Sequence, residues 1–238
     1  MTDLPIRDLR EWLDQVEQLG ELHRIYPEVD PKMEMSAITY LNGKIPGQPT
    51  LLFENPRGYT GGARVLFNPI GGSMNRLSLA LRTVPGKTPI EMVKYLKERF
   101  TRKIPPVSVD PEEAPIYENS WTEGQVDLGW FPTPTHWPRD GGAYIGTADV
   151  VITQDPETGR INLGTYRQML EGKAQVGYYS SPGKDTLLDR EKWWALGKPC
   201  PVVSVYGVDP LLLICAATGF PKQDSEYDYA GGIQGHTR

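Results

Sequence analysis

Asn162 and Arg167 lie five residues apart in the stretch INLGTYRQML, residues 161–170, and both side chains could take part in binding a ligand. An Asn carbonyl suits a hard cation, and the planar guanidinium of Arg suits a carboxylate. The surrounding apolar residues predict a strand, in which positions five apart face opposite sides. A bend at Gly164 would instead bring both side chains to one ligand. The alternative is a surface Arg and a hairpin Asn.

Two further stretches combine polar side chains with paired glycines. WPRDGGAYIGT (137–147) contains Asp140 before two glycines, which permit positive φ and close backbone approach, and a plain turn is the alternative. SEYDYAGGIQG (225–235) places Glu226 and Asp228 beside two glycines, where a carboxylate could bind a hard cation or belong to a solvated acidic loop. The chain contains no dinucleotide fingerprint, Walker loop, clustered histidines or nucleophilic elbow.

Composition narrows the class of protein. The 238 residues carry a formal charge of −5, so no basic field favours nucleic acid. The longest apolar run, Leu211 to Ala217, is too short to span a bilayer, and the first 20 residues do not resemble a secretion signal. Two cysteines make no disulfide framework. We therefore expect a soluble, cytoplasmic protein whose partner is a small molecule or another protein.

The elements needed to position these side chains can be predicted from periodicity and turn signals. Helical spacing predicts helices near 6–19, 30–40, 76–82, 88–100, 185–197 and 209–219. Short apolar runs bounded by turns predict strands at 50–55, 63–69, 148–153, 161–169, 174–180 and 200–207.

The pattern changes near the middle of the chain. Helices and strands alternate up to the proline-rich stretch 102–115, and hairpin signals at 155–160 and 171–174 then predict three antiparallel strands. We expect an α/β domain over 1–115 and a second domain over 116–238.

Several of these stretches in series resemble the UbiD family of decarboxylases. The resemblance covers the opening helix IRDLREWLDQVEQLGELHRI, the block from FPTPTHWPRDGG to TYRQML, PCPVVSVYGVDPLLLICAATGFP and SEYDYAGGIQG. It implies an α+β protein, with an α/β N-terminal domain followed by an antiparallel split β-barrel of flavin-binding type. It also implies prenylated FMN, Mn²⁺ or Mg²⁺ and often K⁺, used in the reversible decarboxylation of aromatic or α,β-unsaturated acids.

The resemblance also implies roles for single residues. Asn162 and Glu226 match metal ligands, whereas Thr165, Tyr166 and Arg167 match a tripeptide that contacts the flavin. Arg167 would in addition hold the substrate carboxylate and count as the catalytic residue.

The sequence departs from the family in two places. The family often has a His ligand where this chain has Gly183 or Lys184, so we expect Lys184 to pair with the flavin phosphate. Family members are about twice as long, and their acidic catalytic residue would lie beyond residue 238, so the barrel would be incomplete at its C-terminus. We therefore expect negligible turnover by this chain alone, and a dimer, a hexamer or a completing chain. The alternative function is a non-catalytic flavin- or metal-binding subunit, or a structural subunit, of such a complex.

Overall fold

A computed structural model of the chain describes residues 6–235. The first part contains α1 (Leu9–Gln18), β1 (Leu22–Ile25), α2 (Glu34–Asn42), β2 (Thr50–Phe53), β3 (Val65–Phe67), α3 (Met74–Ala80) and α4 (Pro89–Arg99), followed by four short 3₁₀ helices within residues 111–130. The second part contains β4 (Tyr144–Gly146), β5 (Val150–Gln154), β6 (Ile161–Gly164), β7 (Gln168–Gly172), β8 (Gln175–Tyr178), α5 (Asp185–Ala195), β9 (Val203–Val205), α6 (Pro210–Ala217) and α7 (Glu226–Gln234). The α+β class expected from the resemblance is therefore confirmed.

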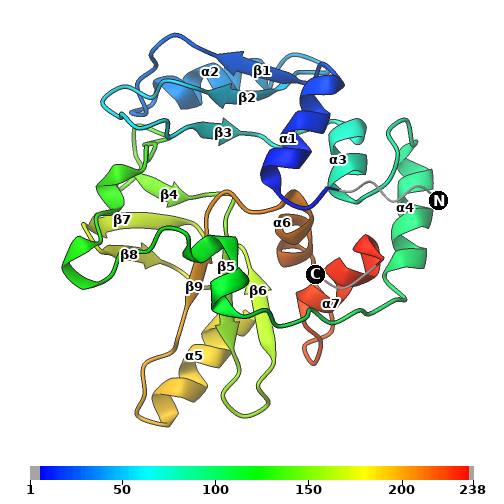
Figure 1. Cartoon of the computed structure of the whole chain (residues 1–238), viewed down its shortest axis with the longest axis vertical. Coiled ribbons are helices and arrows are strands. Elements are labelled where there is room, and N and C mark those ends of the chain that lie inside the picture. The colour runs from blue at the N-terminus through cyan, green and yellow to red at the C-terminus, as the bar shows by residue number, and fades with distance from the viewer. Residues whose placement is uncertain (1–5, 236–238) are drawn as a thin grey trace.

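The first part is built around a small mixed sheet in the order β1-β2-β3. β1 pairs with β2 in parallel and β2 pairs with β3 in antiparallel, and all four residues of β2 are buried. α2 covers this sheet through Met35, which packs with Leu51 and Phe53 (Figure 1). The sequence did not predict β1, because LHRI mixes charged and apolar residues without the alternation of a half-buried strand.

The second part contains two three-stranded antiparallel sheets, in the orders β4-β7-β8 and β6-β5-β9. The predicted antiparallel pairing over residues 148–180 is confirmed. The single strand predicted over 161–169 is wrong, because β6 ends at Gly164 and β7, in the other sheet, begins at Gln168. Within residues 6–235 the two sheets do not join into a closed barrel, so the split barrel stays a prediction.

The segment that follows α4 connects the two parts across α7 (Figure 1). Ile104 N donates to Asp228 O at 3.0 Å, and a Cβ at Gly231 or Gly232 would lie 2.1 or 2.0 Å from the nearest carbonyl oxygen of this segment. The glycine pair thus allows two backbones to touch. The acidic-loop reading of 225–235 is wrong for this reason: glycines that favour a loop in the sequence serve helix packing here. The domain boundary at residue 115 lies within the connecting segment and stays a prediction.

α6 lies at the centre of the molecule, where the two parts meet (Figure 1). Asp209 caps this helix, and its carboxylate accepts from Leu211 N at 2.9 Å and from the Arg82 guanidinium at 2.5 Å. Arg82 Nε also donates to Gln234 Oε1 at 2.9 Å. These buried contacts join the end of α3 to the beginning of α6 and the end of α7.

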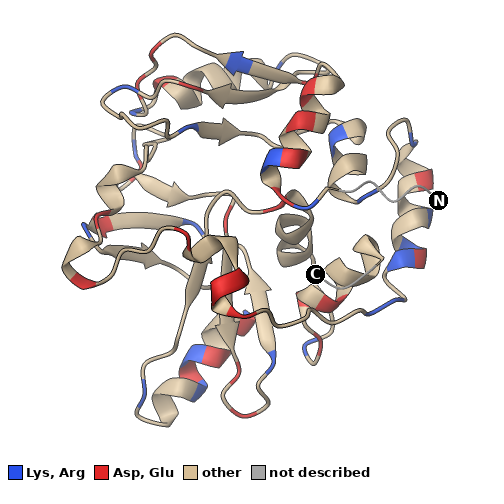
Figure 2. Cartoon of the chain, in the orientation of Figure 1, with Lys and Arg blue, Asp and Glu red and all other residues tan. Residues whose placement is uncertain are grey.

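Charged residues of both signs are interspersed over α1, α4 and α5, as Figure 2 shows. This distribution agrees with the modest net charge of −5. Among residues 6–235, no helix combines the length and the apolar character that a membrane span requires.

Candidate functional site

Asn162 projects from β6 into a buried polar layer between the β5–β6 hairpin and α5. Its side chain is 3% exposed, and Nδ2 donates to Thr153 Oγ1 at 3.3 Å and to Thr186 Oγ1 at 3.2 Å. Thr153 is the cross-strand partner of Asn162 on β5, and Thr186 lies in the first turn of α5. Both bonds use the amide nitrogen, and neither engages the carbonyl oxygen Oδ1.

Glu226, the first residue of α7, reaches the strand position next to Asn162. Its Oε2 accepts from Leu163 N at 2.8 Å, on the edge strand of its sheet. Burial raises the pKa of Glu226, and the Leu163 amide and its own backbone amide partly offset this effect. The structure therefore brings the two residues expected to bind a metal to adjacent positions, although they are 64 residues apart in the sequence.

Charged groups that the sequence reasoning did not select surround this pair. Arg160 lies 3.8 Å from a carboxylate oxygen of Asp185 and 3.8 Å from one of Asp189. Lys222 lies 3.9 Å from Asp185 and donates to Gly183 O at 3.5 Å. Arg160 was read as part of a hairpin turn, and only its place beside Asn162 in the chain could have suggested a role at this site.

Lys184 occupies the N-cap position of α5 beside these charges. Its side chain is exposed and forms no hydrogen bond or ion pair with another described residue. The Lys184 side chain therefore has no contact that orients it toward the Asn162–Glu226 pair.

Thr165, Tyr166 and Arg167 form the connection between β6 and β7. A Cβ on Gly164 would lie 2.5 Å from the ring of Tyr166, so glycine is needed where this ring folds back over the strand end. The Tyr166 ring also contacts the Tyr178 ring at 5.8 Å between centroids. β6 ends at Gly164, and Thr165 and Arg167 are exposed beyond it. A bend that brings Asn162 and Arg167 to one ligand stays a prediction.

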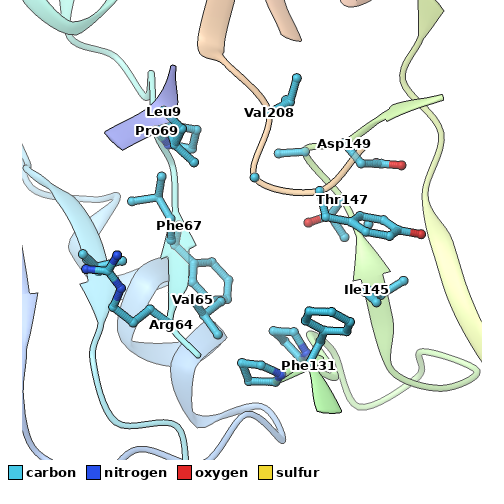
Figure 3. A pocket seen from close by; sticks show the side chains of 18 of the residues that line it. Leu9, Arg64, Val65, Phe67, Pro69, Phe131, Ile145, Thr147, Asp149 and Val208 are labelled. Carbon is cyan, nitrogen blue, oxygen red and sulfur yellow. The ribbon is translucent and has the colours of Figure 1, made fainter. Parts of the chain in front are cut away.

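Arg167 lies at a cavity of about 890 Å³ between the two parts of the chain. Its guanidinium carbon lies 4.8 Å from the centre of the Tyr144 ring. Figure 3 shows two facing walls, with Val65 and Phe67 on one side and Ile145, Thr147 and Val208 on the other. Neither Asn162 nor Glu226 is among the described residues that line the cavity. The candidate residues thus fall into two places, the Asn162–Glu226 pair and the Arg167 cavity.

Two titratable groups at the cavity have buried polar atoms without a hydrogen-bond partner in the described chain. His136 Nδ1 contacts Ser36 Oγ at 2.9 Å, but its Nε2 has no partner in the described chain. Burial lowers the pKa of His136, Asp140 partly offsets this effect, and Arg167 adds to it. Neither carboxylate oxygen of Asp149 has a partner outside its own residue, and burial raises the pKa of Asp149 to about 6. Neither group stands in a sequence pattern that indicates a role at a site.

The DGG motif has a structural part in this wall. Asp140 Oδ2 accepts from the backbone amides of His136 and Trp137 at 3.2 and 2.9 Å. The two glycines after it do not adopt positive φ; they pack closely against Met169. The positive φ that these glycines permit is therefore not adopted, and their close contact is with a side chain. A turn, the alternative considered from the sequence, closes just before them, where Asp140 N donates to Trp137 O at 3.0 Å.

The donor set at the pair is too small to hold a metal alone. Across residues 6–235, no three or more His, Cys, Asp or Glu side chains gather in a way that could bind an ion. Asn and Glu oxygens are nevertheless the type of ligand that Mg²⁺ and Mn²⁺ prefer. The residues present therefore fit a hard cation whose remaining ligands come from a bound group or water.

Comparison with solved structures reveals close similarity along the whole chain. Vanillic acid decarboxylase from Sedimentibacter hydroxybenzoicus, in its closed form, is 29% identical, with a TM-score of 0.89 over 98% of this chain and 49% of the other. An evolved dimeric form of HmfF from Pelotomaculum thermopropionicum, solved with prenylated FMN, is 28% identical, with a TM-score of 0.85 over 98% of this chain and 52% of the other. The chain thus spans about half the length of these relatives.

Two family models match the sequence in succession. The N-terminal domain of 3-octaprenyl-4-hydroxybenzoate carboxy-lyase matches residues 13–96, and the Rift-related domain of the same enzyme matches residues 107–237. Together they account for both parts of the fold and for all the candidate residues. The chain therefore belongs to the UbiD family, as its motifs indicated.

Proposed function

We propose that the chain supplies the cofactor- and metal-binding part of a carboxy-lyase that acts reversibly on an aromatic or α,β-unsaturated carboxylic acid. The cofactor would be prenylated FMN together with Mn²⁺ or Mg²⁺. Support comes from the family membership and from the flavin-bound relative HmfF.

The observation that carries this proposal is the convergence of Asn162 and Glu226. The Glu226 carboxylate reaches the backbone of Leu163, the residue next to Asn162, only because α7 docks on the edge strand β6. A divalent cation would relieve the cost of burying the Glu226 carboxylate, since a nearby positive charge favours the ionised form. We assign Asn162 Oδ1 and the Glu226 carboxylate as the metal ligands of this chain.

The surroundings of the pair suit a phosphate group. α5 and α7 both begin there, and the first backbone amides of a helix attract anions. Arg160 and Lys222 add positive charge, and Lys184, exposed at the N-cap of α5, is free to turn toward a bound phosphate. A flavin phosphate would thus complete the metal shell and be held by the helix ends.

We place the flavin ring near Thr165 and Tyr166 and the substrate carboxylate on Arg167. When bound, prenylated FMN supplies the electron-accepting chemistry that loss of CO₂ requires. Arg167 offers a planar fork for the carboxylate, and Tyr144 holds this guanidinium at the cavity. Apolar side chains such as Phe67 would receive the aromatic or unsaturated body of the substrate.

Association with further protein is part of the proposal, as a homo-oligomer (dimer or hexamer) or with a completing chain. Trp193 Nε1 donates to Gln154 O within the chain at 2.8 Å, whereas the neighbouring Trp194 is 59% exposed. An exposed Trp of this kind is typical of contact surfaces. Light scattering that shows a monomer at high concentration would contradict association.

Binding of Mn²⁺, followed by electron paramagnetic resonance with and without FMN, tests the metal site. We expect Glu226→Gln to weaken Mn²⁺ binding and Asp228→Asn, the same change two residues later in α7, to leave it unaltered. CO₂ release from aromatic and acrylic acids tests the reaction in the completed, cofactor-loaded protein, where Arg167→Ala should abolish it. Equal Mn²⁺ affinity of Glu226→Gln and the parent chain would contradict the ligand assignment.

A further inference from the structure

Asn162 belongs to a chain of buried hydrogen bonds that continues to a carboxylate of α5. Thr153 Oγ1 contacts Asp189 Oδ2 at 2.6 Å, and Asn162 Nδ2 contacts the same Oγ1 at 3.3 Å. All three side chains are at most 3% exposed. Thr186 lies one turn before Asp189 on the same face of α5. Its Oγ1 accepts a second hydrogen bond from Asn162 Nδ2 at 3.2 Å.

The chemistry of these groups fixes the direction of each bond. An ionised carboxylate can only accept, whereas a hydroxyl has one proton to donate and lone pairs with which to accept. Burial raises the pKa of Asp189, whereas the Thr153 hydroxyl at 2.6 Å and Arg160 at 3.8 Å favour its ionised form. The Thr153 hydroxyl therefore donates its one proton to Asp189, so it can only accept a hydrogen bond from Asn162.

The direction of the bonds decides which end of the amide faces α5. With Thr153 as an acceptor, the Asn162 NH₂ group must point toward the two threonines. The carbonyl oxygen Oδ1 of the same amide then points away from them. If Asp189 could donate, Thr153 would be free to donate to Oδ1, and the amide could rotate. An NH₂ group cannot ligate a cation, so the orientation of the amide determines whether Asn162 can serve as a metal ligand.

We propose that Asp189 is a positioning residue which, through Thr153, holds Asn162 with its carbonyl oxygen available to the divalent cation. This inference rests on the proposed function of the Asn162–Glu226 pair. Outer hydrogen-bond partners commonly fix ligand orientation in this way, and their loss typically weakens metal affinity by about 10–100-fold. A purely structural network would change stability without this specific effect on affinity.

Asp189→Asn is the first test, because it keeps the size of the side chain but can present either its NH₂ group or its oxygen to Thr153, so the direction of the bond is no longer fixed. Mn²⁺ affinity is measured by electron paramagnetic resonance in the presence of FMN, and the midpoint of thermal unfolding is recorded for the same samples. We expect affinity to fall by about 10–100-fold. Glu191→Gln, an acid-to-amide change on the exposed side of α5, is the matched control and should bind as the parent chain does.

Two variants of Thr153 provide a second test, which also applies if Asp189→Asn does not fold. Thr153→Val removes the relay and should weaken Mn²⁺ binding, whereas Thr153→Ser keeps the hydroxyl and should bind more tightly than the valine variant. Parent-like Mn²⁺ affinity in both Asp189→Asn and Thr153→Val would overturn the positioning role of Asp189 but leave the assignment of the metal ligands unchanged. Failure of the parent chain itself to bind Mn²⁺ with FMN would instead overturn the proposed function.

Discussion

Removal of the Asp149 charge should stabilise the protein in a pH-dependent way. Asp149 is 1% exposed, and its carboxylate oxygens have no partner beyond their own residue in the described chain. Burial raises its pKa from 3.8 to about 6. Because each pH unit of this gap corresponds to ~1.4 kcal/mol, the ionised carboxylate costs the folded state about 3 kcal/mol.

The sign follows from which state holds the proton. Below the unfolded pKa of 3.8, Asp149 is protonated in both states and costs nothing in charge burial. As the pH rises toward about 6, the unfolded chain loses the proton first, so folding stability falls, and above that pH the loss is constant. Asp149→Asn is neutral throughout and should therefore gain about 3 kcal/mol over the parent chain between low and neutral pH.

Urea unfolding followed by circular dichroism, repeated at several pH values, measures this difference. Other titrating groups cancel because they are present in both proteins. Asp14→Asn removes an exposed carboxylate of α1 and is the control, for which we expect a small, nearly constant difference. A stability difference between Asp149→Asn and the parent chain that does not change with pH would refute the reasoning.

Two further substitutions test the packing that positions the site. Gly164→Ala would place a Cβ 2.5 Å from the Tyr166 ring; such overpacking typically costs about 1–3 kcal/mol, so the unfolding temperature should fall. Gly172→Ala, whose nearest neighbour would be 3.8 Å away, should cost less; equal losses would contradict the close contact. Asp209→Ala removes the buried carboxylate from Arg82 and should cost about 3–5 kcal/mol in urea unfolding. A loss below about 1 kcal/mol, typical of an exposed pair, would show that this ion pair contributes little.

Elements whose burial repeats regularly along the sequence were predicted well. α1 buries Trp12, Leu13 and Val16 on one face, and the same residues carried the helical spacing. α6 begins after Asp209, with Pro210 in its first turn, which is a start signal that does not depend on tertiary contacts. Periodicity and caps are local properties, so they are readable before the fold is known.

The errors arose where a distant segment decides the local structure. The glycines of α7 suggested a loop, but their role is contact with the segment around Ile104, more than 100 residues earlier in the sequence. The strand predicted over 161–169 is divided because its two halves pair with different partners: β6 pairs with β5, whereas β7 pairs with β4 and β8 in the other sheet. Asp149, an unpaired buried carboxyl, shows no local pattern at all.

For the site residues too, the sequence indicates which residue types are involved, but tertiary contacts decide where they lie. The resemblance selected Asn162 and Glu226, but only the docking of α7 on β6 brings them together. It could not select Asp189, because the role inferred for this residue depends on the direction of two hydrogen bonds across α5 and β5.

The two places at which the candidate residues gather limit what ligand could engage both. Asn162 and Arg167 are joined by five residue steps, and a chain spans at most ~3.3–3.6 Å per residue, so their backbones lie within about 18 Å. Arg167 faces the cavity, whereas Asn162 is buried beneath α5 and does not line it. A metal with a small anion could occupy one place only. A ligand that contacts both must be elongated, with an anionic end at the helix termini and a flat or apolar end toward the cavity, which is the shape of a phosphorylated flavin.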